Sequence, residues 1–75
     1  MTRLSVNQRL VLTVVISEGD PTFAQIKSET GLSSSRLNVT LLSLRNRGLV
    51  RAIVTDGETR IYPTRHAHTD QETNA

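Results

Sequence analysis

Arginine side chains concentrate in the middle of the chain, where their chemistry suits an anionic partner. Residues 36–65 hold six arginines against Asp56 and Glu58, a net charge of +4, whereas the charges of residues 1–35 cancel. The planar guanidinium donates two hydrogen bonds at once to a phosphate or to a guanine edge. This distribution favours a nucleic-acid partner, and the alternative is an ordinary solvated basic face.

Residue types typical of a catalytic or metal centre are scarce. The only histidines are His66 and His68, in a polar C-terminal stretch, and the chain has no cysteine. Two histidines alone make a weak metal site, and a polar tail cannot hold a base within hydrogen-bond reach of a nucleophile. A chain of 75 residues also has no room for a deep cleft beside its scaffold. We therefore expect no enzyme activity, no cofactor and no bound metal.

The apolar run Leu10–Ile16 is much shorter than the roughly 20 residues that cross a bilayer, and no stretch resembles a signal peptide. The absence of cysteine fits a reducing compartment. The sequence therefore predicts a soluble cytoplasmic protein without a membrane partner.

Capping signals divide the first half of the chain into two helices. Ser5-Val-Asn-Gln8 and Thr22-Phe-Ala-Gln25 both match the capping-box pattern, in which a hydroxyl accepts from a free first-turn amide. They predict a helix over 6–18 and a short helix that ends at Gly31. The β-branched run at 14–16 leaves a strand open as an alternative for the first segment.

Serines precede a third helix whose two faces differ. Ser33 or Ser34 can cap its amino end, and Gly48 ends it. The inward stripe consists of Leu37, Leu41 and Leu44, with Thr40 beside them. The outward face consists of Ser35, Val39, Leu42, Ser43 and Asn46, with Arg36 and Asn38 at its edges.

The stretch RAIVTDGETRIYPT, residues 51–64, predicts a β-hairpin. Asp56-Gly57 is a strong signal for a type I′ turn, because both central positions of that turn need a positive φ. The turn implies the cross-strand pairs Val54 with Thr59, Ile53 with Arg60, Ala52 with Ile61 and Arg51 with Tyr62. Residues 65–75 are polar, so we expect a folded domain over 1–64 and a disordered tail over 65–75.

Three helices followed by a two-stranded hairpin form the arrangement of a winged helix-turn-helix. The segment TGLSSSRLNVTLLSLRNRGLV, residues 30–50, resembles winged-helix transcriptional regulators of the MarR and ArsR type. The matching features are Gly31-Leu32-Ser33 at the turn, Leu41 and Leu44 inside the third helix, and Gly48-Leu49-Val50 leading into the wing. The resemblance implies a mainly α fold with a small β-hairpin, and sequence-specific binding of double-stranded DNA by a small transcriptional regulator. The small size suggests a regulator of a virus, plasmid or other mobile element.

The resemblance also implies which residues meet the DNA. The start of the third helix enters the major groove, and the wing lies near the minor groove or the backbone. The expected DNA-binding residues are Thr22, Ser34, Ser35, Arg36, Asn38, Val39, Ser43, Asp56, Gly57 and Arg60. By chemistry, Arg36 suits guanine, Asn38 suits adenine and Val39 suits a thymine methyl group. Thr22 opens a helix whose amino end can bind a phosphate.

The chain departs from those families after the wing, where they carry a further helix that forms the dimer. We therefore expect a homodimer, if one forms, to use Leu12 and Ile16, which flank the main apolar stripe of the first helix. The alternative is that both residues belong to the core. Val39 and Leu42 leave a second function open, because exposed apolar residues on this helix also suit a protein partner. In that reading the winged helix is a protein-protein interaction module.

Overall fold

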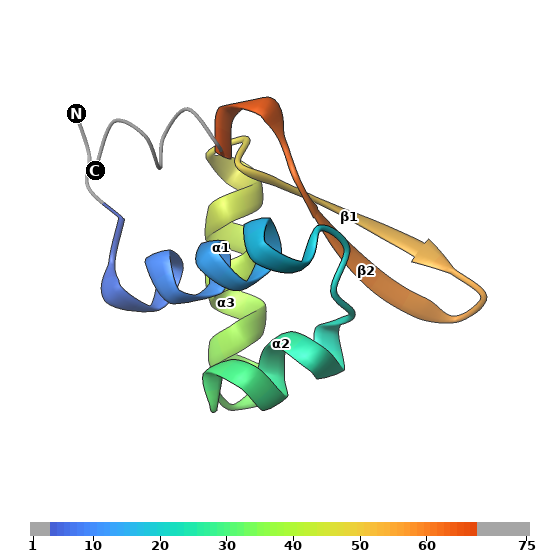
Figure 1. Ribbon diagram of the computed structural model, residues 1–75. Helices are drawn as coiled ribbons and strands as arrows, with labels where there is room; N and C mark the ends of the chain where they lie inside the picture. The colour runs from blue at the N-terminus through green and yellow to red at the C-terminus, as the bar shows by residue number, and fades with distance from the viewer. Residues whose placement is uncertain (1–3, 68–75) are drawn as a thin grey trace.

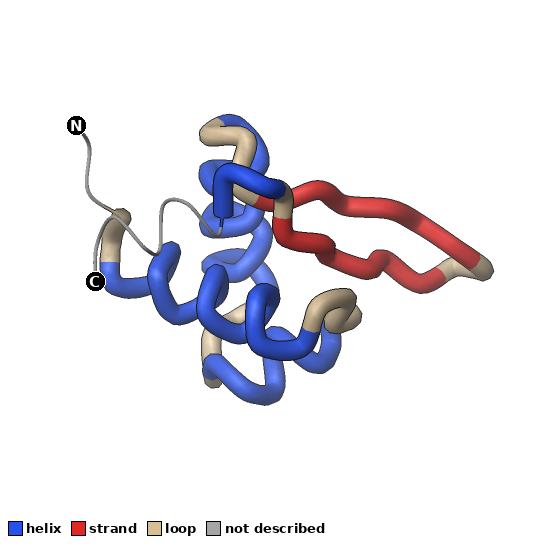
Figure 2. Tube along the Cα trace, turned by 45° about the horizontal axis from the view of Figure 1, so that its top comes forward, coloured by secondary structure: helices blue, strands red, loops and turns tan. Residues whose placement is uncertain are grey.

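A computed structural model describes residues 4–67, which form three helices and a two-stranded hairpin (Figure 1). In chain order the elements are α1 (Val6–Glu18), α2 (Phe23–Thr30), α3 (Ser34–Asn46), β1 (Val50–Thr55) and β2 (Glu58–Pro63). The helices make one body, and the hairpin projects from it as a wing (Figure 2). The predicted mainly α fold with a wing is confirmed, and the strand alternative for residues 14–16 is wrong because they lie inside α1.

A hydroxyl caps the amino end of each helix, as the capping signals predict. The Ser5 hydroxyl accepts from the Gln8 amide at 3.1 Å, and the Gln8 side chain accepts from the Ser5 amide at 2.8 Å. Thr22 and Gln25 form the same reciprocal pair at 3.2 and 2.8 Å. Ser33 caps α3 by accepting from the amide three residues on, at 3.1 Å. Each cap satisfies a backbone donor that has no partner inside its helix and stabilises the fold by about 1 kcal/mol.

The core lies between α1, α3 and the base of the wing. Its buried side chains include Val11, Leu12 and Val15 from α1, Ile26 from α2, Leu37, Leu41 and Leu44 from α3, and Leu49, Val50 and Ile61 from the wing.

Leu12 is fully buried at the centre of this core, and Ile16 is half-buried against it. Leu12 therefore belongs to the core, as the alternative expects, and is not available to a dimer surface, whereas Ile16 keeps part of its side chain exposed. The physical reason is the number of neighbours of α1, which packs against α2, α3 and β2. A helix with partners on several sides buries a wider arc than a single stripe, and Leu12 falls inside that arc.

The wing has the register that the Asp56-Gly57 turn predicts. Its pairs include Ala52 with Ile61 and Arg51 with Tyr62, and the two strands run antiparallel. The φ angles are 51° at Asp56 and 79° at Gly57. Both central residues therefore have the positive φ that a type I′ turn requires.

The base of the wing is also tied to the segment before α2. The Ile61 amide donates to the Pro21 carbonyl at 2.9 Å, and Thr22 forms an antiparallel bridge with Arg60. This isolated β-bridge was not predicted from the sequence. It fixes the start of α2 against β2, so the cap of α2 and the wing lie side by side.

The folded part of the chain extends beyond the boundary predicted at residue 64. The Thr64 hydroxyl donates to the Gly48 carbonyl at 2.6 Å, and residues 65–67 form a helical turn that buries Ala67 in the core. The predicted tail is thus corrected for residues 65–67, because one small apolar side chain was enough to anchor the turn. Residues 68–75 of that tail, including His68, lie outside the described residues. Between residues 4 and 67, none of the helices has the length and apolar character needed to span a membrane.

Candidate nucleic-acid interface

The outer face of α3 is exposed along its first two turns. The predicted contact residues Ser34, Ser35, Arg36, Asn38 and Val39 are all exposed. Val39 is 66% exposed and Leu42 is 55% exposed. These values matter because such apolar side chains, left uncovered on a helix, are available to a partner. The capped start of α3 can approach another surface closely, since two serines stand where bulkier side chains would block it.

A groove runs between α3 and the wing, made of two adjoining hollows that share Phe23, Asn38 and Thr59. The hollow nearer the wing tip is lined by Thr22, Phe23, Ala24, Asn38, Gly57, Glu58 and Thr59. The hollow nearer the helix end is lined by Phe23, Asn38, Leu41, Leu42, Arg45, Ala52, Thr59 and Ile61. The structure therefore brings together Thr22, Asn38 and Gly57 of the predicted DNA-binding residues, and adds Leu42 of the predicted partner surface.

Arg45 is a candidate contact residue that the sequence reasoning missed. Its side chain is exposed and lines the groove beside Leu42 and Ala52. A signal for it was present, because Asn38, Leu42 and Arg45 follow one another at spacings of four and three residues. Residues so spaced share one face of a helix, so the groove-facing stripe ends in a guanidinium.

The amino end of α2 opens into the hollow nearer the wing tip. Thr22 is the N-cap, and its hydroxyl satisfies the Gln25 amide. Phe23 and Ala24 occupy the next two positions, whose amides have no acceptor inside a helix. Because the helix dipole adds partial positive charge there, this corner of the groove suits a phosphate oxygen.

Ser43 lies on the other side of α3 from the groove. Its hydroxyl accepts a hydrogen bond from the side-chain amide of Gln8 on α1, at a half-buried position. Ser43 thus contributes to the contact between α1 and α3, and its contact with DNA stays a prediction. A helix of 13 residues that packs against α1 and the wing leaves only part of its circumference free.

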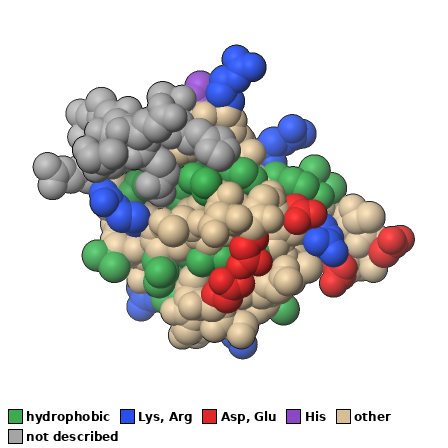
Figure 3. Space-filling view, viewed as in Figure 1, with side chains coloured by type: hydrophobic (Ala, Val, Ile, Leu, Met, Phe, Trp, Pro, Cys, Tyr) green, Lys and Arg blue, Asp and Glu red, His purple; other side chains and the backbone are tan. Residues whose placement is uncertain are grey.

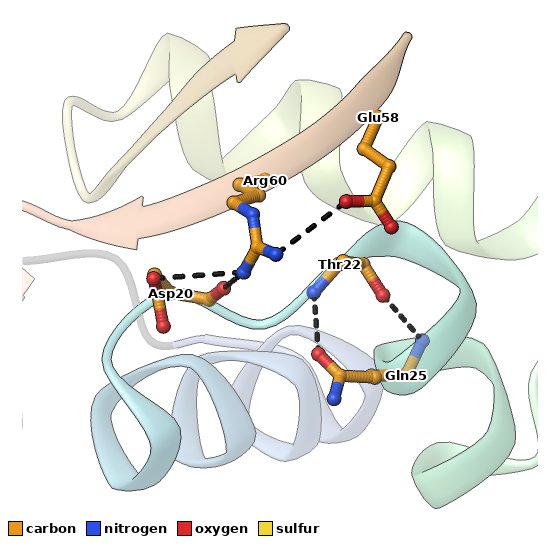
Figure 4. Close-up of polar contacts among 5 residues, drawn as sticks. All are labelled: Asp20, Thr22, Gln25, Glu58 and Arg60. Carbon is orange, nitrogen blue, oxygen red and sulfur yellow. Dashed lines mark hydrogen bonds and ion pairs between the residues drawn. The ribbon is translucent and has the colours of Figure 1, made fainter. Parts of the chain in front are cut away.

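Arg60, the predicted wing cation, is engaged with two carboxylate residues of its own chain (Figure 4). Its Nη1 donates to the Asp20 carbonyl at 3.1 Å and lies 3.6 Å from an Asp20 carboxylate oxygen. Its Nη2 donates to Glu58 Oε2 at 3.4 Å. The guanidinium therefore points toward the turn before α2, whereas the wing tip at Asp56 and Gly57 is exposed.

In the view of Figure 3, acidic side chains lie over α1 and α2, and others lie along the wing at the right. Glu18, the last residue of α1, is hydrogen-bonded through its side chain to Glu29 of α2. That hydrogen bond, followed by desolvation and the repulsion between the two charges, raises the pKa of Glu18 above its usual range. Neither glutamate lines the groove, so the negative charge of this pair lies away from the candidate interface.

Among the side chains of residues 4–67, no group of three or more His, Cys, Asp or Glu is placed to hold a metal ion.

Known structures share this arrangement of helices and wing, although no protein-family model and no curated protein sequence matches the chain. Oxidized MarR from Escherichia coli matches with a TM-score of 0.86 at 18% identity, over 93% of this chain and 52% of that chain. BpsR of Bordetella bronchiseptica, whose DNA binding is regulated by 6-hydroxynicotinic acid, matches with a TM-score of 0.86 at 15% identity, over 96% of this chain and 53% of that chain. Reduced AbfR bound to DNA matches with a TM-score of 0.84 at 26% identity, over 93% of this chain and 51% of that chain.

The chain spans about half the length of each of these three proteins. The matched part covers 93% to 96% of this chain. The chain is a winged helix-turn-helix domain that resembles the MarR-family regulators of transcription.

Proposed function

We propose that this protein binds double-stranded DNA as a regulator of transcription, with α3 in the major groove and the wing against the backbone or the minor groove. The observation that carries the proposal is the exposed polar start of α3 beside a groove that a phosphate can enter. The major groove of B-DNA admits one α-helix. Solved DNA complexes of AbfR and of MarR, two proteins with this fold, support the same partner.

The base contacts in this proposal come from the outer face of α3. Arg36 can donate two hydrogen bonds to guanine, and Asn38 can pair with the edge of adenine. Val39 offers an apolar surface to a thymine methyl group. All three side chains are exposed, so no rearrangement of the helix is needed for them to reach base edges.

The phosphate contacts come from the rim of the groove. Thr22 and the first-turn amides of α2 bind one phosphate at the amino end of the helix, with the amides donating hydrogen bonds to its oxygens. Ser34 and Ser35 contact the DNA backbone beside the major groove. Arg45 contacts a phosphate that enters the protein's groove between α3 and the wing. Such contacts set the position of the protein on the duplex, whereas the base contacts set the sequence preference.

The wing tip contributes through its backbone. In our proposal Gly57 brings the chain close to the sugar-phosphate backbone, because no side chain stands in the way. Asp56 keeps the turn in the left-handed conformation, with a φ of 51°. Asp and Asn tolerate that conformation better than most residues.

The test is an amide-resolved NMR titration of the labelled protein with a duplex of about 20 base pairs at two salt concentrations. Shift changes should gather on Thr22, on residues 34–39 and 45, and on the wing tip. Affinity should fall steeply with salt, since each neutralised phosphate adds about −0.9 to the slope of log K against log salt. A spectrum that does not change at low salt would refute the proposal.

Arg36→Ala and Arg9→Gln form a matched pair for this titration. Both remove one positive charge, but Arg9 lies on α1, whereas Arg36 is exposed in the first turn of α3, beside Ser35 and Val39. We expect Arg36→Ala to weaken binding by about tenfold, as the loss of one good base contact does. Arg9→Gln should change affinity by less than about twofold. Equal losses in both variants would show that only net charge matters.

A protein partner is the second candidate, because Val39 and Leu42 are 66% and 55% exposed. An apolar pair of this kind on one helix face can dock against a protein groove. Leu42→Ser distinguishes the two functions. If it abolishes a complex with a protein and leaves DNA affinity intact, α3 is a protein-binding surface.

A further inference from the structure

Arg60 acts on the groove through its neighbours. Its guanidinium lies between two carboxylate residues, with Nη1 3.6 Å from Asp20 Oδ2 and Nη2 3.4 Å from Glu58 Oε2. Nη1 also donates to the Asp20 carbonyl at 3.1 Å. The Arg60 side chain is only 35% exposed, whereas those of Asp20 and Glu58 are 55% and 59% exposed. The Arg60 side chain is thus the most buried of the three.

The backbone holds Arg60 in this position. Arg60 forms a β-bridge with Thr22. In this bridge the backbone amide of Ile61 donates to the Pro21 carbonyl at 2.9 Å. This bridge, with its hydrogen bond from Ile61 to Pro21, fixes the starting point of the side chain beside the turn that precedes α2. Figure 4 shows the guanidinium directed at that turn, between Asp20 and Glu58.

Glu58 is the member of the cluster that matters for an anionic ligand. It lines the hollow nearer the wing tip, together with Thr22, Ala24 and Gly57. That hollow is where the amino end of α2 suits a phosphate. A carboxylate on the wall of this hollow disfavours a bound phosphate, because two negative charges repel each other strongly in a partly desolvated groove.

We propose that Arg60 is a positioning residue: it holds and neutralises Glu58 and Asp20 so that the groove accepts a phosphate, and it makes no phosphate contact itself. The inference rests on the proposed function of DNA binding. It assigns to Arg60 a different role from the direct wing contact that the sequence predicts. Without Arg60, the freed Glu58 carboxylate turns toward the hollow and the two negative charges repel the duplex.

The cluster can be altered without unfolding the protein. Ion pairs between partly exposed side chains contribute little to stability, and the backbone links at Pro21 and Thr22 need no side chain from Arg60. Arg60→Met keeps the length and apolar stem of the side chain and removes the charge. Thermal unfolding of each variant checks that the fold is retained.

The experiment is a double-mutant cycle on affinity for a random-sequence duplex of about 20 base pairs at low salt. The four proteins are the wild type, Arg60→Met, the pair Asp20→Asn with Glu58→Gln, and the combination of all three changes. We expect Arg60→Met to weaken binding about fivefold in the wild-type background. With both carboxylates neutralised, affinity should rise, and Arg60→Met should then cost less than about twofold.

Glu29→Gln is the matched control, since it removes one negative charge from a residue that does not line the groove. Combined with it, Arg60→Met should still cost about fivefold. An equal or larger cost of Arg60→Met in the neutralised background overturns the proposal, because a freed guanidinium would then be contacting phosphate. Weaker binding by the Asp20→Asn, Glu58→Gln protein also overturns it, because the ion pairs would then only hold the shape of the wing.

Failure of the proposed function gives a different result. If the wild type does not bind the duplex at all, both proposals fall. If the wild type binds and the cycle shows no coupling between Arg60 and the two carboxylates, only the role of Arg60 is refuted.

Discussion

The side-chain amide of Gln8 on α1 donates a hydrogen bond to the hydroxyl of Ser43 on α3. The same Gln8 accepts from the Ser5 amide at 2.8 Å in the cap of α1. One side chain thus joins the start of α1 to the second half of α3. The contact adds to the packing of α3 against α1, which rests mainly on the buried side chains Leu37, Leu41 and Leu44.

Ser43→Ala removes the acceptor of this contact and leaves a half-buried amide without its partner. We expect the free energy of unfolding to fall by about 1 kcal/mol and DNA affinity to stay unchanged. Urea unfolding followed by circular dichroism measures the first, and duplex titration measures the second. Ser35→Ala is the control, and its effect on stability should be within about 0.5 kcal/mol. If Ser43→Ala keeps normal stability and weakens DNA binding, Ser43 contacts DNA and its contact with Gln8 contributes little.

Leu12→Ala tests the corrected position of this residue in the core. Leu12 is fully buried, whereas Leu10 on the same helix is 39% exposed. We expect Leu12→Ala to lower the free energy of unfolding by about 3 kcal/mol, a large share of the stability of so small a domain. Leu10→Ala should cost less than about 1 kcal/mol. If Leu12→Ala leaves stability intact and changes only the sedimentation of the protein, the dimer surface is the correct assignment.

Arg45→Gln tests the groove residue that the sequence reasoning missed. If Arg45 meets one phosphate, its loss should weaken binding to all duplexes alike and reduce the slope of log K against log salt by about 0.9. Fluorescence anisotropy at four or five salt concentrations gives the slope. Arg9→Gln, on α1, is the control and should leave the slope unchanged. A slope that stays the same in Arg45→Gln excludes a phosphate contact by this side chain.

The Glu18–Glu29 pair makes a prediction about pH. The pKa of Glu18 is raised above its usual value of 4.5 by the hydrogen bond to Glu29, by desolvation and by repulsion. The folded protein therefore binds this proton more tightly than the unfolded chain does. The resulting stability is fully present below the unfolded pKa and is lost as the pH rises through the folded pKa.

Glu29→Gln removes the repulsion at neutral pH and keeps a hydrogen-bonding partner for Glu18. We expect its Tm to exceed that of the wild type at about pH 7, and the difference to vanish by about pH 4. Thermal unfolding across this range measures both values. Glu58→Gln is the control, because Glu58 pairs with Arg60 and its loss should not raise the Tm at neutral pH. A constant difference in Tm at all pH values would contradict the explanation by protonation of Glu18.

The local features of this protein were determined by the sequence alone. The two capping boxes, the ends of α2 and α3 at glycine-containing turns, and the register of the wing were all predicted correctly. Each depends on residues only a few positions apart. The Asp56-Gly57 turn sets every pair of the wing, because an antiparallel register follows from the turn that joins the strands.

The tertiary structure decided which side chains remain available to a partner. Leu12 is buried because α1 packs against three neighbouring elements. Ser43 accepts a hydrogen bond from Gln8, which lies 35 residues away in the chain but beside it in space. Arg60 meets Asp20 across 40 residues of sequence, and Ala67 is buried in the core. Composition and helical periodicity describe a segment by its own residues. They contain no information on the angle at which two segments pack, and that angle decides which face of each helix is covered.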